Sequence, residues 1–313
     1  MSKLFIIGNG FDLAHGIPTT FNHFKEYLRN NYKYDYDEYP SSLWLDSRTS
    51  NDGSQIYDDD QCAKIIDFMI CEVNHDREDW KYFEKSMGHF DYSLIEEEIE
   101  EQYDKEGDVN PFHTGNNYEQ AYNDLSNVMS RLTDLFSDWI NTIDIPEKCY
   151  SVFNLNTYYN FSALIDVDND IFLSFNYTET LEELYEVDTV NHIHGKQNDN
   201  IIVGHNVHRE FDEKAYGQDL QMDSMHKFFE KPTTEIIYDN SDFFTDLEDI
   251  DSIYSYGFSF GCVDLPYIKE IIKNINTANM TWYLHSYNTE LEKKQYKEII
   301  KQCGFLGSFD EFD

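Results

Sequence analysis

Short apolar runs alternate with amphipathic helical sequence along much of the chain. Six runs have the pattern of buried strands: KLFIIG at 3–8, DIFLSF at 170–175, TVNHIH at 189–194, NIIVGH at 200–205, SIYSYGFSF at 252–260 and MTWYLHS at 280–286. Three helical stretches follow such runs: ETLEELYE at 179–186, LPYIKEIIKNIN at 265–276 and ELEKKQYKEIIKQ at 290–302. This alternation predicts an α/β fold with a Rossmann-like, mainly parallel sheet.

Two stretches interrupt the alternation. Between about Tyr34 and Tyr150 the sequence is aromatic, acidic and helical in pattern, with no clear strand run. A shorter acidic stretch covers about 209–249. We interpret the chain as a single domain over 1–313 with a large helical insertion and a smaller acidic one. Each insertion either forms a lid or simply enlarges the core.

Charge limits the partners of this chain. It carries 61 acidic and 23 basic side chains, a formal net charge of -38. Such a field repels phosphate backbones, so we expect no general nucleic-acid or anionic-membrane binding. A small anionic ligand stays open, because charges beyond about 8 Å are largely screened at physiological salt. A protein partner would be basic.

The cysteines and the apolar runs indicate in which cellular compartment the protein is expected. The five cysteines are scattered and form no Cys-x-x-Cys pair, which is typical of reduced thiols; they are Cys62, Cys71, Cys149, Cys262 and Cys303. No run approaches the roughly 18 to 20 apolar residues that span a bilayer, and the N-terminal run is too short for a signal peptide. We therefore expect a cytoplasmic protein without membrane association.

A glycine turn closes the first apolar run, in LFIIGNGFDLAHGIPTTF at 4–21. Gly8, Asn9 and Gly10 place small residues where backbone N–H groups could approach a phosphate closely. The spacing departs from G-x-G-x-x-G because Leu13 occupies the third position, which disfavours a dehydrogenase. Taken alone, the pattern fits either a structural tight turn or a nucleotide-binding turn.

Motifs along nearly the whole chain resemble one family. In order they are IIGNGFDLAHGIPTTF, WKYFE with Trp80 and Glu84, SFNYTETLEELY, HIHG and GFSFGCVD. This series resembles the bacteriophage abortive-infection AbiH family. The resemblance implies a role in phage defence, with a phage or host protein as a trigger.

More distantly, the same order is similar to the sirtuin-like NAD-binding fold. The resemblance implies a ligand, NAD or a related nucleotide, and a cofactor-binding set of Gly8, Asn9, Gly10, Asp12, Gly16, Ile17, Pro18, Thr19, Gly195, Gly257, Ser259 and Asp264. The carboxyl ends of parallel strands form the usual ligand crevice of such sheets. The runs that end at Gly8, Asn176, His194 and Gly257 are therefore predicted to be neighbours in one sheet.

Asn176 and His194 are the candidate catalytic residues that this resemblance implies. The Asn176 amide would hold a water or a ribose hydroxyl, although Asn176 also suits a helix cap before ETLEELYE. His194 would act as general base or ribose partner, whereas a lone histidine on an apolar strand is often a core residue. His192 lies on the opposite face by the period of two and is interpreted as structural. Both candidates are expected to face an open crevice and to contribute little to stability.

Other candidates also have structural alternatives. Asp12 would bind ribose hydroxyls or cap a turn, and Thr19 would cap the following helix. Asp264 is predicted to be the N-cap before LPYIKEII, while Gly257 and Ser259 would contact the adenosine side. Glu84 would be costly on an apolar face unless it is paired or faces a pocket.

Three functions remain open from the sequence. The chain lacks paired cysteines for a structural zinc, and Thr-Thr-Phe replaces the Phe-Arg common after the sirtuin-like Gly-Ile-Pro turn, so both features disfavour protein deacylation. The leading hypothesis is hydrolysis of the nicotinamide–ribose bond of NAD. The alternatives are a nucleotide sensor that acts through a protein partner, and a metal-dependent phosphoesterase that uses His192, His194, His205 and His208.

Overall fold

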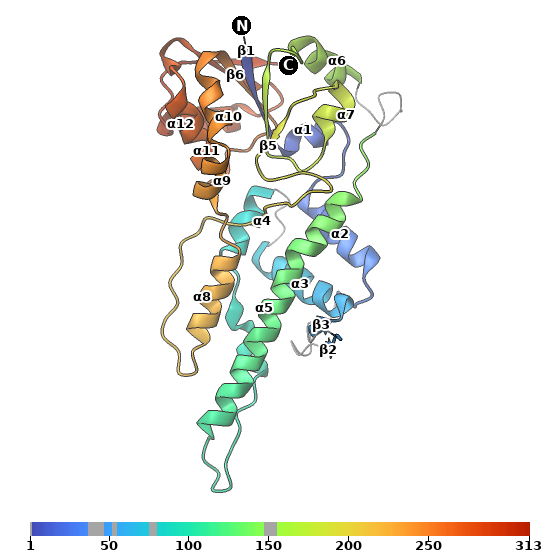
Figure 1. Ribbon diagram of the computed structural model, residues 1–313, viewed down its shortest axis with the longest axis vertical. Coiled ribbons are helices and arrows are strands. Elements are labelled where there is room, and N and C mark those ends of the chain that lie inside the picture. Colours follow the sequence, from blue (N-terminus) through green and yellow to red (C-terminus); the bar gives the residue numbers. More distant parts are fainter. Residues whose placement is uncertain (1, 37–46, 52–54, 75–79, 147–154) are drawn as a thin grey trace. The chain divides into compact units, whose positions relative to one another are not determined.

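A six-stranded sheet joins residues from the beginning, middle and end of the chain (Figure 1). The computed structural model describes residues 2–36, 47–51, 55–74, 80–146 and 155–313. The strands are β1 (Ser2–Ile7), β4 (Ile171–Ser174), β5 (Asn191–His192), β6 (Ile250–Tyr256), β7 (Thr281–His285) and β8 (Ser308–Phe312). Their order is β5-β4-β1-β6-β7-β8, and all neighbours pair in parallel. The predicted α/β, Rossmann-like, parallel fold is therefore confirmed.

The apolar composition of β1 follows from its central position, because a strand in the middle of a covered sheet is buried on both faces. Leu4 and Ile6 point into one core, and Phe5 and Ile7 point into the other. All four are at most 1% exposed. The two faces of the sheet thus require the unbroken run LFII rather than an alternating one.

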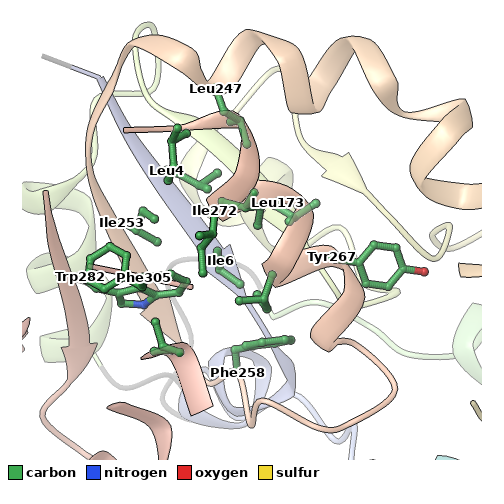
Figure 2. Packing of buried hydrophobic residues seen from close by; sticks show 14 of the residues in the cluster. Leu4, Ile6, Leu173, Leu247, Ile253, Phe258, Tyr267, Ile272, Trp282 and Phe305 are labelled. Atoms are coloured by element: carbon green, nitrogen blue, oxygen red, sulfur yellow. The ribbon is translucent and has the colours of Figure 1, made fainter. Parts of the chain in front are cut away.

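Four helices cover the face that Leu4 and Ile6 enter (Figure 2). They are α9 (Thr233–Asp239), α10 (Ser241–Thr245), α11 (Leu265–Asn274) and α12 (Glu290–Gln302). The indole N–H of Trp282 donates a 2.7 Å hydrogen bond to the Ser255 hydroxyl, so this buried polar atom has a partner. Tyr267 of α11 is fully buried in this core and carries its hydroxyl toward the strand ends.

Helices also cover the opposite face, which is rich in aromatic rings. They are α1 (Asn9–Ala14), α6 (Leu155–Leu164) and α7 (Thr180–Tyr185). The ring of Phe5 stacks on Phe172 and Tyr254, with centroids 5.3 and 5.0 Å away. Phe161 of α6 meets Phe5 edge-on at 5.5 Å. Such pairs stabilise a core beyond the area that they bury.

Five of the six predicted strand runs contain strands of the sheet, whereas the predicted strand in NIIVGH at 200–205 is wrong. Residues 200–204 form no strand, and His205 makes only an isolated bridge to Glu230. The Ile202 N–H instead donates to the carbonyl oxygen of His194, so this apolar run folds back on the preceding strand end. The edge strand β8 was missed because its sequence, SFDEF, is charged and largely exposed.

The chain groups into two units. One contains the sheet and consists of Met1–Thr20, Ile140–Ile202 and Lys231–Asp313. The other consists of Phe21–Trp139 and Val203–Glu230. The expected insertion boundaries, at about 34–150 and 209–249, stay a prediction.

The second unit is mainly helical. Its helices are α2 (Phe21–Asn31), α3 (Asp59–Asn74), α4 (Trp80–Met87), most of α5 (Pro111–Asn141) and α8 (Gln218–Phe228), with the 3-10 turn η1 (Tyr92–Glu98). The expectation of no strand here is wrong, because β2 (Ser47–Thr49) and β3 (Gln55–Tyr57) form a small antiparallel pair. Glu84 is buried, with 9% of its surface exposed.

The cysteines and the helix lengths were also considered in the sequence, and the structure describes both. Cys62, Cys71, Cys262 and Cys303 are free thiols, and Cys149 lies outside the described residues. Of the helices within the described ranges, none combines the length and the apolar character needed to cross a bilayer.

Candidate functional site

The glycine turn after β1 packs directly against the turn after β6. The Gly8 N–H donates to the Tyr256 carbonyl at 2.9 Å, and the Gly10 N–H donates to the Gly257 carbonyl at 3.0 Å. Gly257 has φ +66°, and a Cβ there would lie 2.1 Å from the Phe11 nitrogen. Only glycine permits this backbone-to-backbone contact. The two glycine N–H groups that were expected to cradle a phosphate thus already have acceptors.

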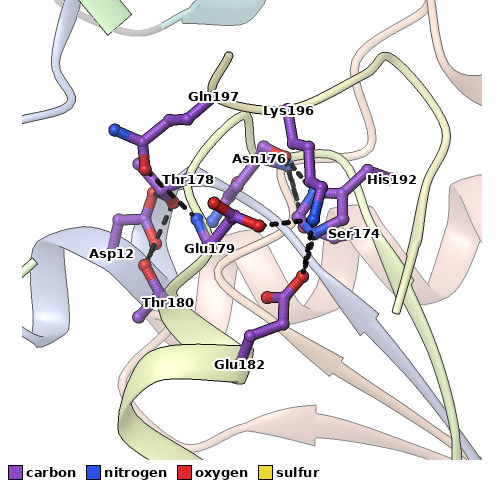
Figure 3. Close-up of polar contacts among 10 residues, drawn as sticks. All are labelled: Asp12, Ser174, Asn176, Thr178, Glu179, Thr180, Glu182, His192, Lys196 and Gln197. Atoms are coloured by element: carbon purple, nitrogen blue, oxygen red, sulfur yellow. Dashed lines mark hydrogen bonds and ion pairs between the residues drawn. The ribbon is translucent and has the colours of Figure 1, made fainter. Parts of the chain in front are cut away.

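Asp12 is the centre of a buried hydrogen-bonded group on the α1 side of the sheet (Figure 3). Its two carboxylate oxygens accept from the hydroxyls of Thr178, at 2.6 Å, and Thr180, at 2.9 Å. Asp12 is 1% exposed, and this burial raises its pKa to about 6 against the lowering effect of those hydroxyls and of Asn176. Asp12 therefore joins α1 to the first residue of α7 and to the segment just before it.

Asn176 belongs to the same group. It follows β4, is 6% exposed, and its side-chain Nδ2 donates to the Gly8 carbonyl at 3.1 Å. Its carbonyl oxygen lies 3.0 Å from Nδ1 of His192. The N-cap residue of α7 is Glu179, so the helix-cap interpretation of Asn176 is wrong. The expected open crevice is also wrong for this side chain, which links two strand ends inside the protein.

His192 has the structural environment that the strand period predicted. Its Nε2 lies 2.8 Å from the Glu182 carboxylate, opposite the Asn176 carbonyl on Nδ1 (Figure 3). Lys196 pairs with Glu179 and lies 3.9 Å from Glu182. The charged side chains of Glu179, Glu182 and Lys196 thus lie together beside the end of β5.

His194 lies in a second group, on the α11 side. It is 3% exposed, and its Nε2 lies 3.3 Å from the Tyr267 hydroxyl, 3.5 Å from Lys231 Nζ and 3.8 Å from Asp264 Oδ1. Burial, and then the positive charge of Lys231, hold the His194 pKa well below its usual value of 6.5. The imidazole is therefore neutral at physiological pH, and the same two causes make it a weaker base than an exposed histidine.

Asp264 occupies the predicted N-cap position of α11 but does not cap it through its side chain. Its Oδ1 lies 3.6 Å from Lys231 Nζ instead. Burial raises the Asp264 pKa, and the neighbouring Lys231 opposes that change. The capping interpretation is thus corrected: the residue is at the cap, but its carboxylate faces the His194 group.

Lys231 was not among the residues found from the sequence. It lies in FEKPTTEII, beside acidic residues, where a lysine ordinarily indicates a solvated surface. Its side chain is fully buried. The signal that was available is weak, a single lysine before a proline, and burial next to His194 depends on long-range packing.

The other predicted contact residues differ in backbone conformation and in exposure. Gly16 has φ +76° and Gly195 has φ +81°, and a Cβ on Gly195 would lie 2.0 Å from the Asn200 carbonyl oxygen. Ile17 and Thr19 are buried, Pro18 is exposed, and Asn9 and Ser259 are half-buried. Their predicted contacts with a nucleotide stay predictions.

The structure brings the two candidate catalytic residues to adjacent strands. The strands that precede Gly8, Asn176, His194 and Gly257 are neighbours, as predicted. Asn176 bonds toward Gly8, whereas His194 contacts Tyr267 and Lys231. The carboxyl end of the sheet therefore has two polar groups, one on each side of it.

The four histidines of the metal hypothesis have other partners. His205 contacts the His226 carbonyl through Nε2 at 3.1 Å, and the His208 side chain is 89% exposed. Within the described ranges, the ligand-type atoms close enough to hold a metal belong to Asp104, Glu106 and Asp108, all exposed. That group contains none of the four histidines.

The fold and the polar strand ends define an α/β, Rossmann-like protein with buried ionisable groups at the carboxyl edge of its sheet. Residues 4–286 match the model of the family described as bacteriophage abortive infection AbiH. The chain therefore belongs to the AbiH family, and its role is in abortive infection of phage-infected cells. No curated protein and no solved structure matches the chain.

Proposed function

We propose that the protein binds NAD or a related nucleotide at the carboxyl end of the sheet and hydrolyses its nicotinamide–ribose bond. The observation that carries this proposal is the environment of His194, a neutral and buried imidazole at the end of β5. A general base needs to be unprotonated at the working pH. Loss of NAD from an infected cell would be a sufficient basis for abortive infection.

The proposed reaction requires few groups. Water adds to the anomeric carbon of the ribose while the bond to the nicotinamide nitrogen breaks, and nicotinamide leaves with that electron pair. The proton of the water passes to His194. Asn176 would orient the water or a ribose hydroxyl, for which its amide would have to release the Gly8 carbonyl.

A second function, nucleotide sensing without turnover, is favoured by a specific observation. The N–H groups of Gly8 and Gly10 are hydrogen-bonded to Tyr256 and Gly257, so a pyrophosphate at this turn would require the two turns to separate. A ligand that opens such a contact changes the conformation of the protein. That change would reach a phage or host protein partner.

The test is to incubate purified protein with NAD and to follow nicotinamide release by chromatography, with NAD binding measured in parallel. We expect release by the wild type and a loss of roughly 10²-fold or more in His194→Gln. His205→Gln is the matched control, because it removes another fully buried histidine from the other unit. Binding without product would favour the sensor, and neither binding nor product would overturn both functions.

A further inference from the structure

Lys231 is a buried lysine held against His194. Its side chain is fully buried, with Nζ 3.5 Å from His194 Nε2 and 3.6 Å from Asp264 Oδ1. A buried ammonium is costly unless a carboxylate pairs with it. Asp264 is in position to be that counter-ion.

The contact with Lys231 determines where the His194 ring carries its proton. An ammonium has three donors and no acceptor, so a ring nitrogen that faces it must be the acceptor. A contact of this kind favours the neutral ring that carries its hydrogen at Nδ1 and leaves Nε2 as the acceptor. The Tyr267 hydroxyl approaches the same Nε2, at 3.3 Å. The Phe175 ring packs edge-on against the imidazole, with centroids 5.4 Å apart, which restricts ring rotation.

Lys231 also marks a crossing of the chain between the two units. Ile202 is the last residue of the sheet-containing unit before the crossing, and Lys231 is the first after it. The Ile202 N–H donates a 2.8 Å hydrogen bond to the His194 carbonyl, and Lys231 meets the His194 ring. Both ends of this crossing thus contact the backbone or the side chain of His194.

We propose that Lys231 is a positioning residue that holds His194 as the neutral Nδ1–H tautomer, with Asp264 as the counter-ion of the lysine. The consequence for catalysis rests on the proposed function. The tautomer and the titration of His194 do not, so the two ideas can fail separately.

Removing the Lys231 charge and removing the Asp264 charge should shift the His194 pKa in opposite directions. Without the Lys231 ammonium, the Asp264 carboxylate is the charge nearest to Nε2, at 3.8 Å, and it stabilises an imidazolium. Without the Asp264 charge, the Lys231 ammonium has no carboxylate beside it and, as long as it keeps its proton, opposes protonation of His194 further. The remaining polar neighbour, Tyr267, is the same in both cases.

The experiment is an NMR titration of full-length protein with ¹⁵N-labelled histidine, in which His194→Gln assigns the ring signals. We expect an unprotonated Nε2 in the wild type and in Lys231→Arg. In Lys231→Met the His194 pKa should rise by about one pH unit or more. In Asp264→Asn the His194 pKa should fall below its value in the wild type.

Lys293→Met is the matched control. It removes another buried lysine of the same unit, one that pairs with Glu290 at 2.6 Å and Glu311 at 2.7 Å. It should leave the His194 signals unchanged. Identical His194 titrations in the wild type and Lys231→Met would overturn the proposal, as would a raised pKa in Asp264→Asn. If Lys231→Met does not fold, Asp264→Asn and Lys231→Arg decide the question alone.

Nicotinamide release adds an independent measurement. If the wild type turns over NAD, Lys231→Met should lower kcat roughly 10-fold or more with little change in KM, and it should shift the acidic limb of the pH profile upward. Lys231→Arg should retain most of kcat. A release rate unaffected by Lys231→Met would overturn the catalytic role of the lysine. A wild type without turnover would overturn the proposed function while the NMR result still decides the tautomer.

Discussion

The side-chain amide of Asn176 donates a 3.1 Å hydrogen bond to the Gly8 carbonyl and so fastens the end of β4 to the end of β1. The sequence predicted little stability from this residue, but the side chain is buried. Asn176→Ala leaves a buried carbonyl without this donor and should lower the free energy of unfolding by about 1 to 3 kcal/mol. Urea denaturation followed by circular dichroism measures that loss.

Asn169→Ala serves as the control for Asn176→Ala. Asn169 also donates through its side chain, to Asp166 at 2.9 Å, but this contact is exposed. Its removal should change the free energy of unfolding by less than about 0.5 kcal/mol. Equal effects of the two substitutions would contradict the structural role of Asn176.

Asp12 should make stability depend on pH in an unusual direction. Burial raises its pKa from 3.8 to about 6, so the folded protein holds this proton more tightly than the unfolded chain does. The stability that Asp12 contributes is complete below pH 3.8 and is lost as the pH rises through about 6. That loss is about 3 kcal/mol by linkage.

Asp12→Asn removes this titration and keeps a polar side chain of the same size. Relative to the wild type, the variant should therefore gain about 2 kcal/mol of unfolding free energy between pH 4 and pH 7, since part of the loss lies below pH 4. Denaturation series at several pH values give the difference directly and cancel the other titrating groups. A difference that stays flat with pH, or that changes in the opposite direction, would show that Asp12 keeps an ordinary pKa.

Gly257 should tolerate no side chain. In Gly257→Ala the new Cβ would lie 2.1 Å from the Phe11 nitrogen, at a residue whose φ is +66°. Backbone overlap and left-handed strain together should cost about 3 to 5 kcal/mol, visible as a large drop in Tm or as insoluble protein.

Gly217→Ala separates the two causes. Gly217 has φ +76°, but a Cβ there meets nothing within 4 Å. Its substitution should therefore show the left-handed strain alone, about 1 to 2 kcal/mol. A Gly257→Ala variant no less stable than Gly217→Ala would mean that the two turns are not in contact in solution.

The sequence predicted the part of the fold that follows from local pattern. The runs around β1, β4 and β6 are largely apolar because both faces of the sheet are covered, and such short apolar runs can be recognised in the sequence. The run at 200–205 has the same composition but pairs only at His205, because Ile202 bonds back to the His194 carbonyl. Composition does not distinguish a strand from an apolar return loop.

The candidate site was less predictable because its contacts join residues far apart in sequence. The His194 ring meets Lys231 and Tyr267, which lie 37 and 73 positions away. Neither partner is part of a motif. Asp264 was found through the chemistry of helix caps, and its position was right although its side chain has a different partner.

The central position of β1 has a consequence for how the protein is made. β1 is synthesised long before its partners, because it pairs with β4, which begins at Ile171, and with β6, which ends at Tyr256. The sheet therefore cannot close on the ribosome until most of the chain has emerged, whereas much of the second unit is complete by Trp139. A nascent chain would carry no assembled strand-end site. Any activity that depends on the strand ends would thus begin only after β6 has been translated.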